Sequence, residues 1–307
     1  MATLAITGGT GFVGSHLLTL AGNEGHRVRA LTRRPQPQRA GIEWVPGTLD
    51  DPAGLAALMK GADAVIHVAG VINVPRRADF AAGNITGTEA MIDAARAAGV
   101  SRFIHVSSLA AREPGLSDYG WSKRESEDRM AQSGLDWTIV RPPAVYGPGD
   151  RETLELFRMA AGGIVLLPPA GRLSVIEVGD LARLLICLAL DTSTVGRTFE
   201  PDDGRAGGWG HREFAEALGN AVGRRGRGLP LPARLIGCGA AIDTGRAWLT
   251  RSTAKLSFDR ARYMCHPDWA VSAAAQPPPS VWAPAVDTPS GLAATAAWYR
   301  REGWLRR

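Results

Sequence analysis

Apolar and polar residues follow a pattern that predicts short buried strands separated by helices in the first half of the chain. The predicted strands lie at 4–6, 26–32, 44–47, 64–69, 103–108 and 137–141. Helices are predicted from 15 onward and at 51–61, 85–98 and 118–133. Because strands that alternate with helices of this length form β-α-β units, the pattern predicts an α/β fold with a doubly wound parallel sheet.

The regular alternation ends near residue 149, and the remaining chain is predicted to be mainly helical. Helices are expected at 152–161, 180–190, 211–222, 229–250 and 291–304, with strands at 173–178 and 198–200. The helix at 229–250 is amphipathic. We expect it to lie on the protein surface with its apolar face toward the core, and contact with a membrane is the less favoured alternative. Three aromatic residues of the tail are expected to close a C-terminal core: Trp298, Tyr299 and Trp304.

A glycine-rich turn follows the first predicted strand. The sequence at 7–14, TGGTGFVG, joins an apolar run to a predicted helix. Gly8 and Gly11 allow a tight turn, Gly14 lets the helix approach the strand, and the N–H groups of the helix N-terminus favour a pyrophosphate. We therefore interpret the turn as a dinucleotide-binding turn. The expected domains are a Rossmann-type domain at 1–146, to which 173–200 returns, and a smaller, mostly helical substrate lobe at 147–172 and 201–307.

Composition narrows the class of protein. A chain of 307 residues is expected to form one large domain and a smaller one. Its apolar runs all fall well short of the roughly 20 residues that span a bilayer. Cys187, Cys238 and Cys265 have neither disulfide-framework nor zinc spacing, and the six histidines predict no metal site. These features favour a cytoplasmic protein in a reducing compartment.

Basic residues give the chain a net charge of +5, but they are spread along the sequence. We interpret them as a solvated surface and not as a nucleic-acid site. The chain has 32 arginines and only three lysines, Lys60, Lys123 and Lys255, so each lysine calls for a local explanation.

Hydroxyl and amino groups follow the fifth predicted strand, where a parallel sheet binds its ligands. Ser107 and Ser108 end this strand, and Tyr119 and Lys123 share one face of the next helix, whose expected N-cap is Ser117. A free tyrosine has a pKa of about 10, and a nearby ammonium is expected to lower it. Tyr119 would pass a proton, Lys123 would tune its pKa, and Ser108 would hold the substrate oxygen. Ser107 remains an alternative to Ser108.

Together these motifs resemble the short-chain dehydrogenase/reductase superfamily, in its extended or atypical branch of NAD-dependent epimerase/dehydratase-like proteins. The resemblance covers the whole chain. Within the superfamily, the chain is similar to the subgroup around the NADPH-binding accessory subunit of respiratory complex I and to bacterial epimerase/dehydratase-like reductases. The motifs are TGGTGFVG at 7–14, HVAG at 67–70, N-x-x-G-T at 84–88, HVSS at 105–108, YGWSK at 119–123, RPPAVYGPG at 141–149 and VIEVGDLA at 175–182.

The resemblance implies a nicotinamide cofactor and catalysis by Ser108, Tyr119 and Lys123. It also implies contacts between the cofactor and several strand ends, including a nicotinamide pocket lined by Pro142 and Val145. The expected cofactor contacts are Gly8, Thr10, Gly11, Phe12, Val13, Gly14, Arg33, Arg34, Asp50, Val68, Ala69, Gly70, Ser107, Tyr119, Lys123, Pro142 and Val145.

The end of the second strand predicts which nicotinamide is used. A ribose 2′-OH is usually bound there by Asp or Glu, and a 2′-phosphate by Arg. The chain has no acidic residue between Glu24 and Glu43, whereas Arg33 and Arg34 follow the strand. An arginine fork matches a phosphate, so NADP(H) is favoured over NAD(H). Two interpretations of the next acidic residues stay open: Asp50 or Asp51 contacts the adenine, or Asp50 caps the following helix.

Five further residues are weaker candidates. His67 and His105 stand inside apolar strands and are expected to be satisfied core histidines. Asp180 is expected to cap its helix. Arg141 matches a family position or pairs with a carboxylate. Asn84 is expected to begin a helix, where capping and contact with an active-site water are both open.

The leading functional hypothesis is an NADP(H)-dependent oxidoreductase that interconverts a ketone or aldehyde and an alcohol on a small, fairly apolar substrate. A sugar-nucleotide epimerase or dehydratase is one alternative, which the short segment between Ser108 and Tyr119 disfavours. A non-catalytic NADPH-binding assembly protein is another, which the complete Ser-Tyr-Lys set disfavours. The expected partner is a small-molecule substrate. Three points stay open at this stage: the identity of the substrate, the direction of hydride transfer, and whether the protein is a monomer or a homodimer.

Overall fold

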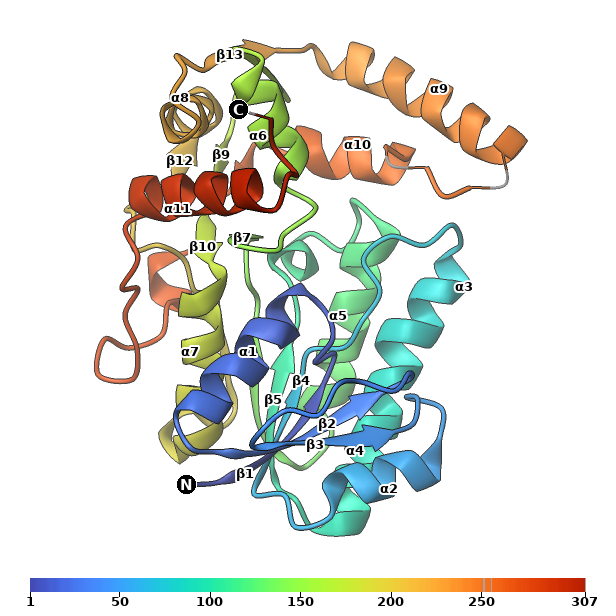
Figure 1. Ribbon diagram of the computed structural model, residues 1–307. Coiled ribbons are helices and arrows are strands. Elements are labelled where there is room, and N and C mark those ends of the chain that lie inside the picture. Colours follow the sequence, from blue (N-terminus) through green and yellow to red (C-terminus); the bar gives the residue numbers. More distant parts are fainter. Residues whose placement is uncertain (251, 255, 307) are drawn as a thin grey trace. The chain divides into compact units, whose positions relative to one another are not determined.

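Two compact units make up the chain in this computed structural model, which describes residues 1–250, 252–254 and 256–306 (Figure 1). The first unit consists of residues 1–141, 181–200 and 277–283, and the second of residues 142–180, 201–276 and 284–307. Lys255, one of the three lysines, lies outside the described residues.

The first unit is built on a parallel sheet, to which the described residues contribute seven strands in the order β11-β6-β5-β4-β1-β2-β3. Each neighbouring pair is parallel. The chain moves from β1 outward to β3 and then returns to β4 on the other side of β1. The carboxyl ends of β1 and β4 therefore form the switch point at which such sheets bind ligands. The strands are β1 (Thr3–Thr7), β2 (Arg27–Thr32), β3 (Ile42–Pro46), β4 (Ala64–His67), β5 (Arg102–Val106), β6 (Asp136–Val140) and β11 (Arg197–Phe199).

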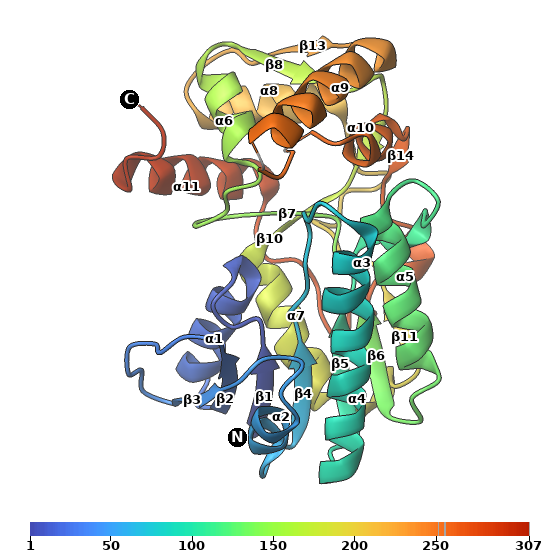
Figure 2. The same cartoon turned by 90° about the vertical axis from the view of Figure 1, so that its right-hand side faces the viewer.

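Helices cover both faces of this sheet, which confirms the predicted doubly wound α/β fold (Figure 2). On one face, α4 contacts both α2 and α5, and the apolar side chains of Leu58, Val65, Met91 and Phe103 form part of the buried core there. The helical elements are α1 (Phe12–Asn23), α2 (Pro52–Met59), α3 (Arg77–Phe80), α4 (Gly87–Ala98), α5 (Asp118–Ala131) and α7 (Val178–Leu190), the π-helical turn η1 (Ala81–Thr86), and the 3-10 turns η2 (Leu109–Arg112) and η3 (Thr192–Thr194).

Residues that the sequence marks as helix boundaries close two of these helices. Ser117 accepts a hydrogen bond from Gly120 N at 3.0 Å and is the N-cap of α5, as predicted. Gly99 has a φ of 72° after the last residue of α4. Glycine adopts this left-handed conformation without a Cβ clash, so α4 ends where the sequence predicts.

The N-cap of α2 is Asp51 and not Asp50. The Asp51 carboxylate accepts a hydrogen bond from Ala53 N at 3.1 Å. The capping interpretation of Asp50 is therefore wrong, because its carboxylate accepts a hydrogen bond from the Thr48 hydroxyl instead.

Helical structure begins earlier than predicted before α4. Helical turns start at Arg77 and run through η1 into α4, so Asn84 lies inside a π-helical turn and does not begin a helix. Segment 77–84 contains Phe80 as its one large apolar residue and also Gly83, so it has no helical periodicity that the sequence could reveal. Single π-helical turns within α-helices are frequent at functional sites.

A buried arginine connects β5 with the end of α7. Arg102 is 5% exposed, and its guanidinium donates hydrogen bonds to the carbonyl oxygens of Leu188 and Asp191 at 2.6 and 3.0 Å and to the Thr194 hydroxyl at 2.8 Å. The last carbonyl groups of a helix have no donor within the helix. Arg102 therefore supplies donors that the end of α7 lacks.

The second unit combines small sheets with helices. Its core contains Phe157, Phe214, Leu292 and the fully buried Tyr299. Its elements are β7 (Ala144–Tyr146), β8 (Ile164–Leu167), β9 (Arg172–Leu173), β10 (Val175–Glu177), β12 (Trp209–Gly210), β13 (Arg227–Pro230), β14 (Asp268–Trp269), α6 (Leu154–Ala161), α8 (His211–Ala221), α9 (Ala233–Thr250), α10 (Phe258–Cys265), η4 (Ala273–Ala275) and α11 (Thr288–Arg301).

Aromatic side chains of the tail close this core, as predicted. Trp298 and Trp304 pack against the cluster that contains Tyr299, and the Tyr299 hydroxyl donates a hydrogen bond to Asp150 O at 2.6 Å. Two predicted elements are divided. The strand predicted at 173–178 becomes β9 and β10, and the helix predicted at 229–250 begins as β13 before α9.

Asp180 does not cap α7, so this prediction is wrong. The Glu177 carboxylate accepts hydrogen bonds from Gly179 N at 2.6 Å and from Asp180 N at 3.1 Å, which is the capping role. The Asp180 carboxylate instead accepts from Ala285 N and Val286 N, both at 2.9 Å, and so holds the segment that precedes α11. Among the described residues, no helix combines the length and the apolar character needed to cross a membrane.

Replacing the buried arginine should destabilise the first unit. Arg102→Ala removes the buried guanidinium and its hydrogen bonds to the carbonyl oxygens of Asp136, Leu188 and Asp191, so we expect the free energy of unfolding to fall by about 3 kcal/mol or more. Urea denaturation followed by circular dichroism measures this change. As a matched control, Arg27→Ala removes an exposed arginine from β2 and should change the free energy by less than about 0.5 kcal/mol. Equal stabilities of the two variants would contradict the role given to Arg102.

Candidate active site

The glycine turn between β1 and α1 has no room for side chains at two positions. A Cβ atom on Gly8, whose φ is 74°, would lie 2.7 Å from Ala69 N, and one on Gly14 would lie 2.0 Å from Gly8 O. Gly11 is the N-cap of α1, and no side chain of the described residues caps the first N–H groups of this helix. Thr10 and Gly11 are exposed. Exposed backbone at an uncapped helix N-terminus is suited to a phosphate group.

The loop after β4 lies against this turn, because Gly8 and Ala69 approach so closely. Asn84, which is 1% exposed, holds the loop: its Oδ1 accepts from Val71 N at 2.7 Å, and its Nδ2 donates to Val71 O at 3.0 Å and to Ser122 Oγ at 2.9 Å. Asn84 thus connects the loop that contains the predicted cofactor contacts Val68, Ala69 and Gly70 with helix α5.

Ser108, and not Ser107, lies beside Tyr119. The Ser108 hydroxyl is near enough to Tyr119 to lower its pKa, and it accepts a hydrogen bond from Ala110 N at 3.2 Å. Ser107 is buried, and its hydroxyl has no hydrogen-bond partner within the described chain. Leaving a buried hydroxyl unpaired costs about 1–3 kcal/mol. Such a group is expected where a bound molecule supplies the missing partner.

Tyr119 is half-buried at the start of α5, with its ring centroid 6.3 Å from that of Phe80. Burial raises the pKa of Tyr119, and the neighbouring Ser108 hydroxyl offsets part of the rise. The predicted net lowering of the Tyr119 pKa is therefore wrong, because the net shift is upward. Burial of the phenol dominates, and the Lys123 ammonium donates to the Val106 carbonyl oxygen at 2.8 Å.

Lys123 is a buried cation one helical turn after Tyr119. It is 4% exposed, and burial lowers its pKa to about 8, against an opposing effect of Glu127. A Cβ atom on Gly70 would lie 3.9 Å from Lys123 Nζ. The amino group therefore lies close to the loop after β4, and its pKa of about 8 is close to neutral pH.

His67 connects the glycine turn with α4 through two hydroxyl groups. Thr88 donates its proton to Asn84 O at 2.7 Å, so its contact of 3.3 Å with His67 requires Nε2–H to be the donor. His67 Nδ1 then accepts from the Thr7 hydroxyl at 2.7 Å. The prediction of a satisfied core histidine is confirmed for His67.

His105 stacks on His67, with ring centroids 5.7 Å apart and an interplanar angle of 18°. Ser126 donates to Lys123 O at 2.7 Å, so His105 Nε2–H donates to Ser126 at 3.0 Å. His105 Nδ1 is left without a partner within the described chain, and the prediction of a fully satisfied side chain is wrong for His105. Burial, together with the Lys123 charge, lowers the pKa of both histidines, that of His67 to about 3.

Arg141 forms an ion-pair network, which confirms its predicted pairing with a carboxylate. Its Nε and Nη2 donate to the two Glu127 oxygens at 2.9 and 2.6 Å, and its Nη1 donates to Glu200 at 3.3 Å. Arg112 also reaches Glu200, at 3.7 Å. The network therefore joins α5 and the residues after β6 and β11 with η2, which directly follows Ser108. The role of the two glutamates as partners of Arg141 was not predicted, because nothing in their local sequence indicates a partner in a distant segment.

Arg33 and Arg34 follow β2, and both are exposed. Neither guanidinium forms an ion pair with a described residue, and the Arg34 carbonyl accepts from the Thr32 hydroxyl at 2.7 Å. Two cationic groups are thus available at the carboxyl end of β2. The hydrogen bond from Thr48 lowers the pKa of Asp50, whose contact with adenine stays a prediction.

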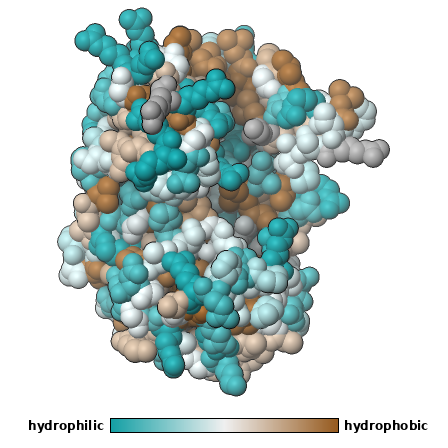
Figure 3. All heavy atoms as spheres, in the orientation of Figure 1, coloured by the Kyte–Doolittle hydropathy of each residue, from teal (hydrophilic) through white to brown (hydrophobic). Residues whose placement is uncertain are grey.

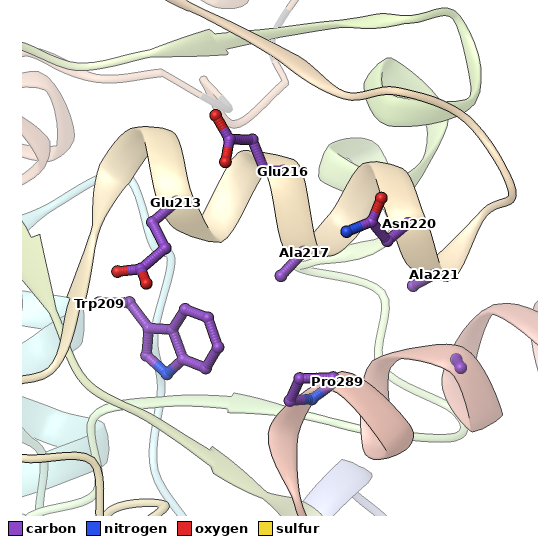
Figure 4. Close-up of a pocket in the computed structure, with 8 residues that line it drawn as sticks. Trp209, Glu213, Glu216, Ala217, Asn220, Ala221 and Pro289 are labelled. Carbon is purple, nitrogen blue, oxygen red and sulfur yellow. The ribbon is translucent and has the colours of Figure 1, made fainter.

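Pro142 and Val145 belong to the second unit, in which Pro142 is buried and Val145 lies on β7. Their contact with the nicotinamide stays a prediction. The second unit also has a pocket of about 340 Å³ between α8 and α11 (Figure 4). Its lining contains none of the predicted site residues and consists of Trp209, Glu213, Glu216, Ala217, Asn220, Ala221, Pro289 and Ala293.

Comparison with known proteins places these features in a family. Residues 8–162, just over half of the chain, match a family model described as NAD(P)H-binding. A ceramide reductase of Caulobacter vibrioides (strain NA1000 / CB15N) is 41% identical over 313 residues, covering 98% of this chain and 96% of the relative. The chain belongs to the extended short-chain dehydrogenase/reductase superfamily. As a member of this superfamily, it is an NAD(P)-dependent enzyme.

Two solved structures share the fold of this chain. The structure described as gox2253 has a TM-score of 0.77 and 22% identity, covering 99% of both chains. The UDP-N-acetylglucosamine 4-epimerase from Bacillus cereus has a TM-score of 0.69 and 19% identity, covering 98% of this chain and 97% of the epimerase. At these identities the likeness concerns the fold alone.

The local geometry fits an NAD(P) cofactor. The glycine turn cannot carry side chains, the N-terminus of α1 is uncapped, and the buried Ser107 hydroxyl lacks a partner among the described residues. These groups stand at the ends of β1 and β5, on the edge where parallel sheets bind ligands.

The buried His67 makes the stability of the first unit sensitive to acid. The unfolded chain protonates this histidine below a pH of about 6.5, whereas the pKa of folded His67 is about 3. The unfolded state thus binds more protons between these values, so stability is fully present above pH 6.5 and declines as the pH falls toward 3. At pH 5 we expect a loss of about 2 kcal/mol from this group. Urea unfolding between pH 8 and pH 5 measures it.

The variant His67→Gln keeps a hydrogen-bonding side chain and removes the titration. The loss of unfolding free energy between pH 8 and pH 5 should shrink by about 2 kcal/mol in this variant. A loss of the same size in both proteins would contradict the assignment.

Proposed function

We propose that this chain is an NADP(H)-dependent oxidoreductase that interconverts a ketone or aldehyde and an alcohol on an apolar, lipid-like substrate. Ser108, Tyr119 and Lys123 are its proposed catalytic residues. The observation that carries the proposal is the placement of Ser108 beside Tyr119, one helical turn before the buried Lys123, at the carboxyl edge of the sheet. In this proposal the first unit binds the cofactor and the second unit supplies the substrate lobe.

Two neighbouring hydroxyl groups suit the chemistry of a carbonyl oxygen. Ser108 and Tyr119 can donate to the same substrate oxygen, and a bound nicotinamide supplies or accepts the hydride at the adjacent carbon. The raised pKa of Tyr119 keeps the phenol protonated at neutral pH, which is the form that gives a proton to the oxygen during reduction. The buried Lys123 ammonium stabilises the negative charge that develops on Tyr119 in this step.

Exposed cations after β2 support NADP(H) over NAD(H). Arg33 and Arg34 are exposed, and no acidic residue stands between Glu24 and Glu43. A guanidinium can bind the 2′-phosphate of NADP(H) in a bidentate manner. A carboxylate at this place would favour the free hydroxyl of NAD(H).

The similarity to the ceramide reductase supports a lipid-like substrate. That relative aligns along nearly the whole chain and so includes the second unit, in which substrate specificity is expected. Ceramide is a long-chain lipid, which agrees with the expectation of an apolar substrate. We propose that the chain acts on a ketone or alcohol group of such a lipid.

The two alternatives are supported less well. The similarity to the UDP-sugar epimerase concerns the fold, at 19% identity. An assembly protein without turnover has no use for a buried lysine beside a Ser-Tyr pair, because burying an ammonium group is unfavourable. The oxidoreductase accounts for both observations.

Substitution of the proposed proton donor should abolish turnover without preventing cofactor binding. For Tyr119→Phe we expect kcat to fall by about 10²–10⁴-fold, the usual contribution of general acid–base catalysis. NADPH oxidation with a panel of long-chain ketones, including a keto form of ceramide, measures kcat, and NADPH fluorescence measures Kd. Tyr263→Phe is the matched control in the second unit and should retain full turnover. Unchanged kcat for Tyr119→Phe would refute the mechanism.

Substitution of the two exposed arginines should change the cofactor preference. In Arg33→Ala/Arg34→Ala we expect the Kd of NADPH to rise about tenfold or more, since each charge-assisted hydrogen bond to phosphate contributes about 1.5–3 kcal/mol. The Kd of NADH should change by less than about twofold, because NADH lacks the 2′-phosphate. An equal rise for both cofactors would show that the arginines do not read the 2′-phosphate.

A further inference from the structure

One helix of the second unit has apolar residues on two opposite sides. On its inner side, α9 buries Ile236, Ala240 and Ala247, and the first two pack with Ala261 of α10. Its outer side carries large apolar residues that are strongly exposed. Their exposed fractions are 57% for Leu235, 74% for Ile242, 80% for Trp248 and 75% for Leu249.

Three of the exposed residues form a stripe along one side of α9. Leu235, Ile242 and Leu249 are each seven residues apart, which is almost two helical turns, so they lie above one another along the outer side of α9. Trp248, which precedes Leu249, lies about 100° further round the helix. The expectation that the apolar face of this helix looks toward the core is therefore correct for the inner side only. The outer side needs another explanation, because monomeric proteins rarely expose large contiguous apolar patches.

Apolar side chains are also exposed on the two-stranded sheet that precedes α9. Ile164 and Leu166 of β8 are 52% and 46% exposed, and Leu229 of β13, the register partner of Leu166, is 49% exposed. β13 ends at Pro230, only two residues before α9 begins. Figure 3 shows hydrophobic residues at the top of the view, in the region of β13.

The same segment holds the positive charge of the chain. Residues 224–262 contain nine arginines and lysines and two aspartates, a net charge of +7. The whole chain carries +5, so the remaining residues together carry −2. The arginines before and on α9 are exposed: Arg224, Arg225, Arg227, Arg234 and Arg246. An exposed apolar stripe and a concentrated positive charge therefore occur in the same 39-residue segment.

We propose that α9 and its basic flanks dock on an anionic lipid surface. The outer stripe of α9 enters the boundary between headgroups and acyl chains, and the arginines contact lipid phosphates. Trp248 has the amphipathic ring that is enriched at this depth. This docking would bring an enzyme for a lipid-like substrate to the surface that holds such substrates. The inference itself rests on the surface of α9 and not on the proposed catalytic residues.

Charge favours this occupant over two others. A second copy of the chain would bring two segments of +7 together, and like charges repel across an interface. A nucleic acid would attract the arginines but would leave the leucine, isoleucine and tryptophan side chains without apolar partners. An anionic bilayer satisfies both the charge and the apolar stripe.

Vesicle flotation with the full chain tests the proposal. We expect binding to vesicles of phosphatidylcholine with about 30% phosphatidylglycerol, and at least about tenfold weaker binding to phosphatidylcholine alone, since several basic residues are attracted to an anionic surface. Raising the salt concentration to about 0.5 M should weaken the binding, because the charges are then screened. Absence of binding to the anionic vesicles would overturn the proposal.

Two variants separate the apolar stripe from other effects. Ile242→Ser/Trp248→Ser/Leu249→Ser should reduce binding to anionic vesicles by about tenfold or more, because three large apolar side chains no longer enter the bilayer. Leu190→Ser removes a 51% exposed leucine from α7 and should bind as the unaltered chain does. Circular dichroism establishes that each variant is folded. Unchanged vesicle binding of the triple variant would overturn the proposal. A second contradicting outcome is an unaltered chain that forms a dimer and does not bind vesicles, together with a triple variant that no longer forms the dimer.

Tyr119→Phe should bind vesicles as the unaltered chain does, because it changes no residue of α9. Vesicle binding and turnover are thus measured independently, and failure of one leaves the other standing.

Discussion

The close approach of α1 to the turn before it governs the geometry of the candidate site. Only hydrogen atoms fit at Gly8 and Gly14, so the turn can rest against the loop after β4. Asn84 then holds this loop to α5, the helix that carries Tyr119 and Lys123. A backbone constraint at the first strand is thereby transmitted to groups that come more than a hundred residues later in the sequence.

Burial decides the electrostatics of this site more than the proximity of charges does. It raises the pKa of Tyr119, lowers that of Lys123 and keeps the stacked histidines neutral. Neutral imidazoles beside a buried ammonium avoid placing several positive charges in one low-dielectric region, which would be costly. Arg141 can remain charged in the same unit because it has two carboxylate partners.

The sequence predicts those features that depend on local patterns. The strands of the first unit, the N-cap Ser117 and the glycine turn follow from periodicity and from residue types at fixed spacing. The errors concern properties set by distant parts of the chain. The carboxylate that caps α7 comes from Glu177 because Asp180 is used by Ala285 and Val286. The pKa of Tyr119 depends on how deeply α5 is buried, and the exposure of α9 depends on which side α10 covers. Neither is visible in a short window of sequence.

The order in which the two units draw on the chain constrains how the protein can form. The first unit takes residues 1–141, then 181–200 and 277–283, with the segments of the second unit between them. During synthesis, six strands of the large sheet are complete before any of the second unit exists, but the edge strand β11 emerges only after residues 142–180. Neither unit is therefore a contiguous fragment, and a nascent chain cannot finish one before beginning the other. Contacts between segments so distant in sequence slow folding.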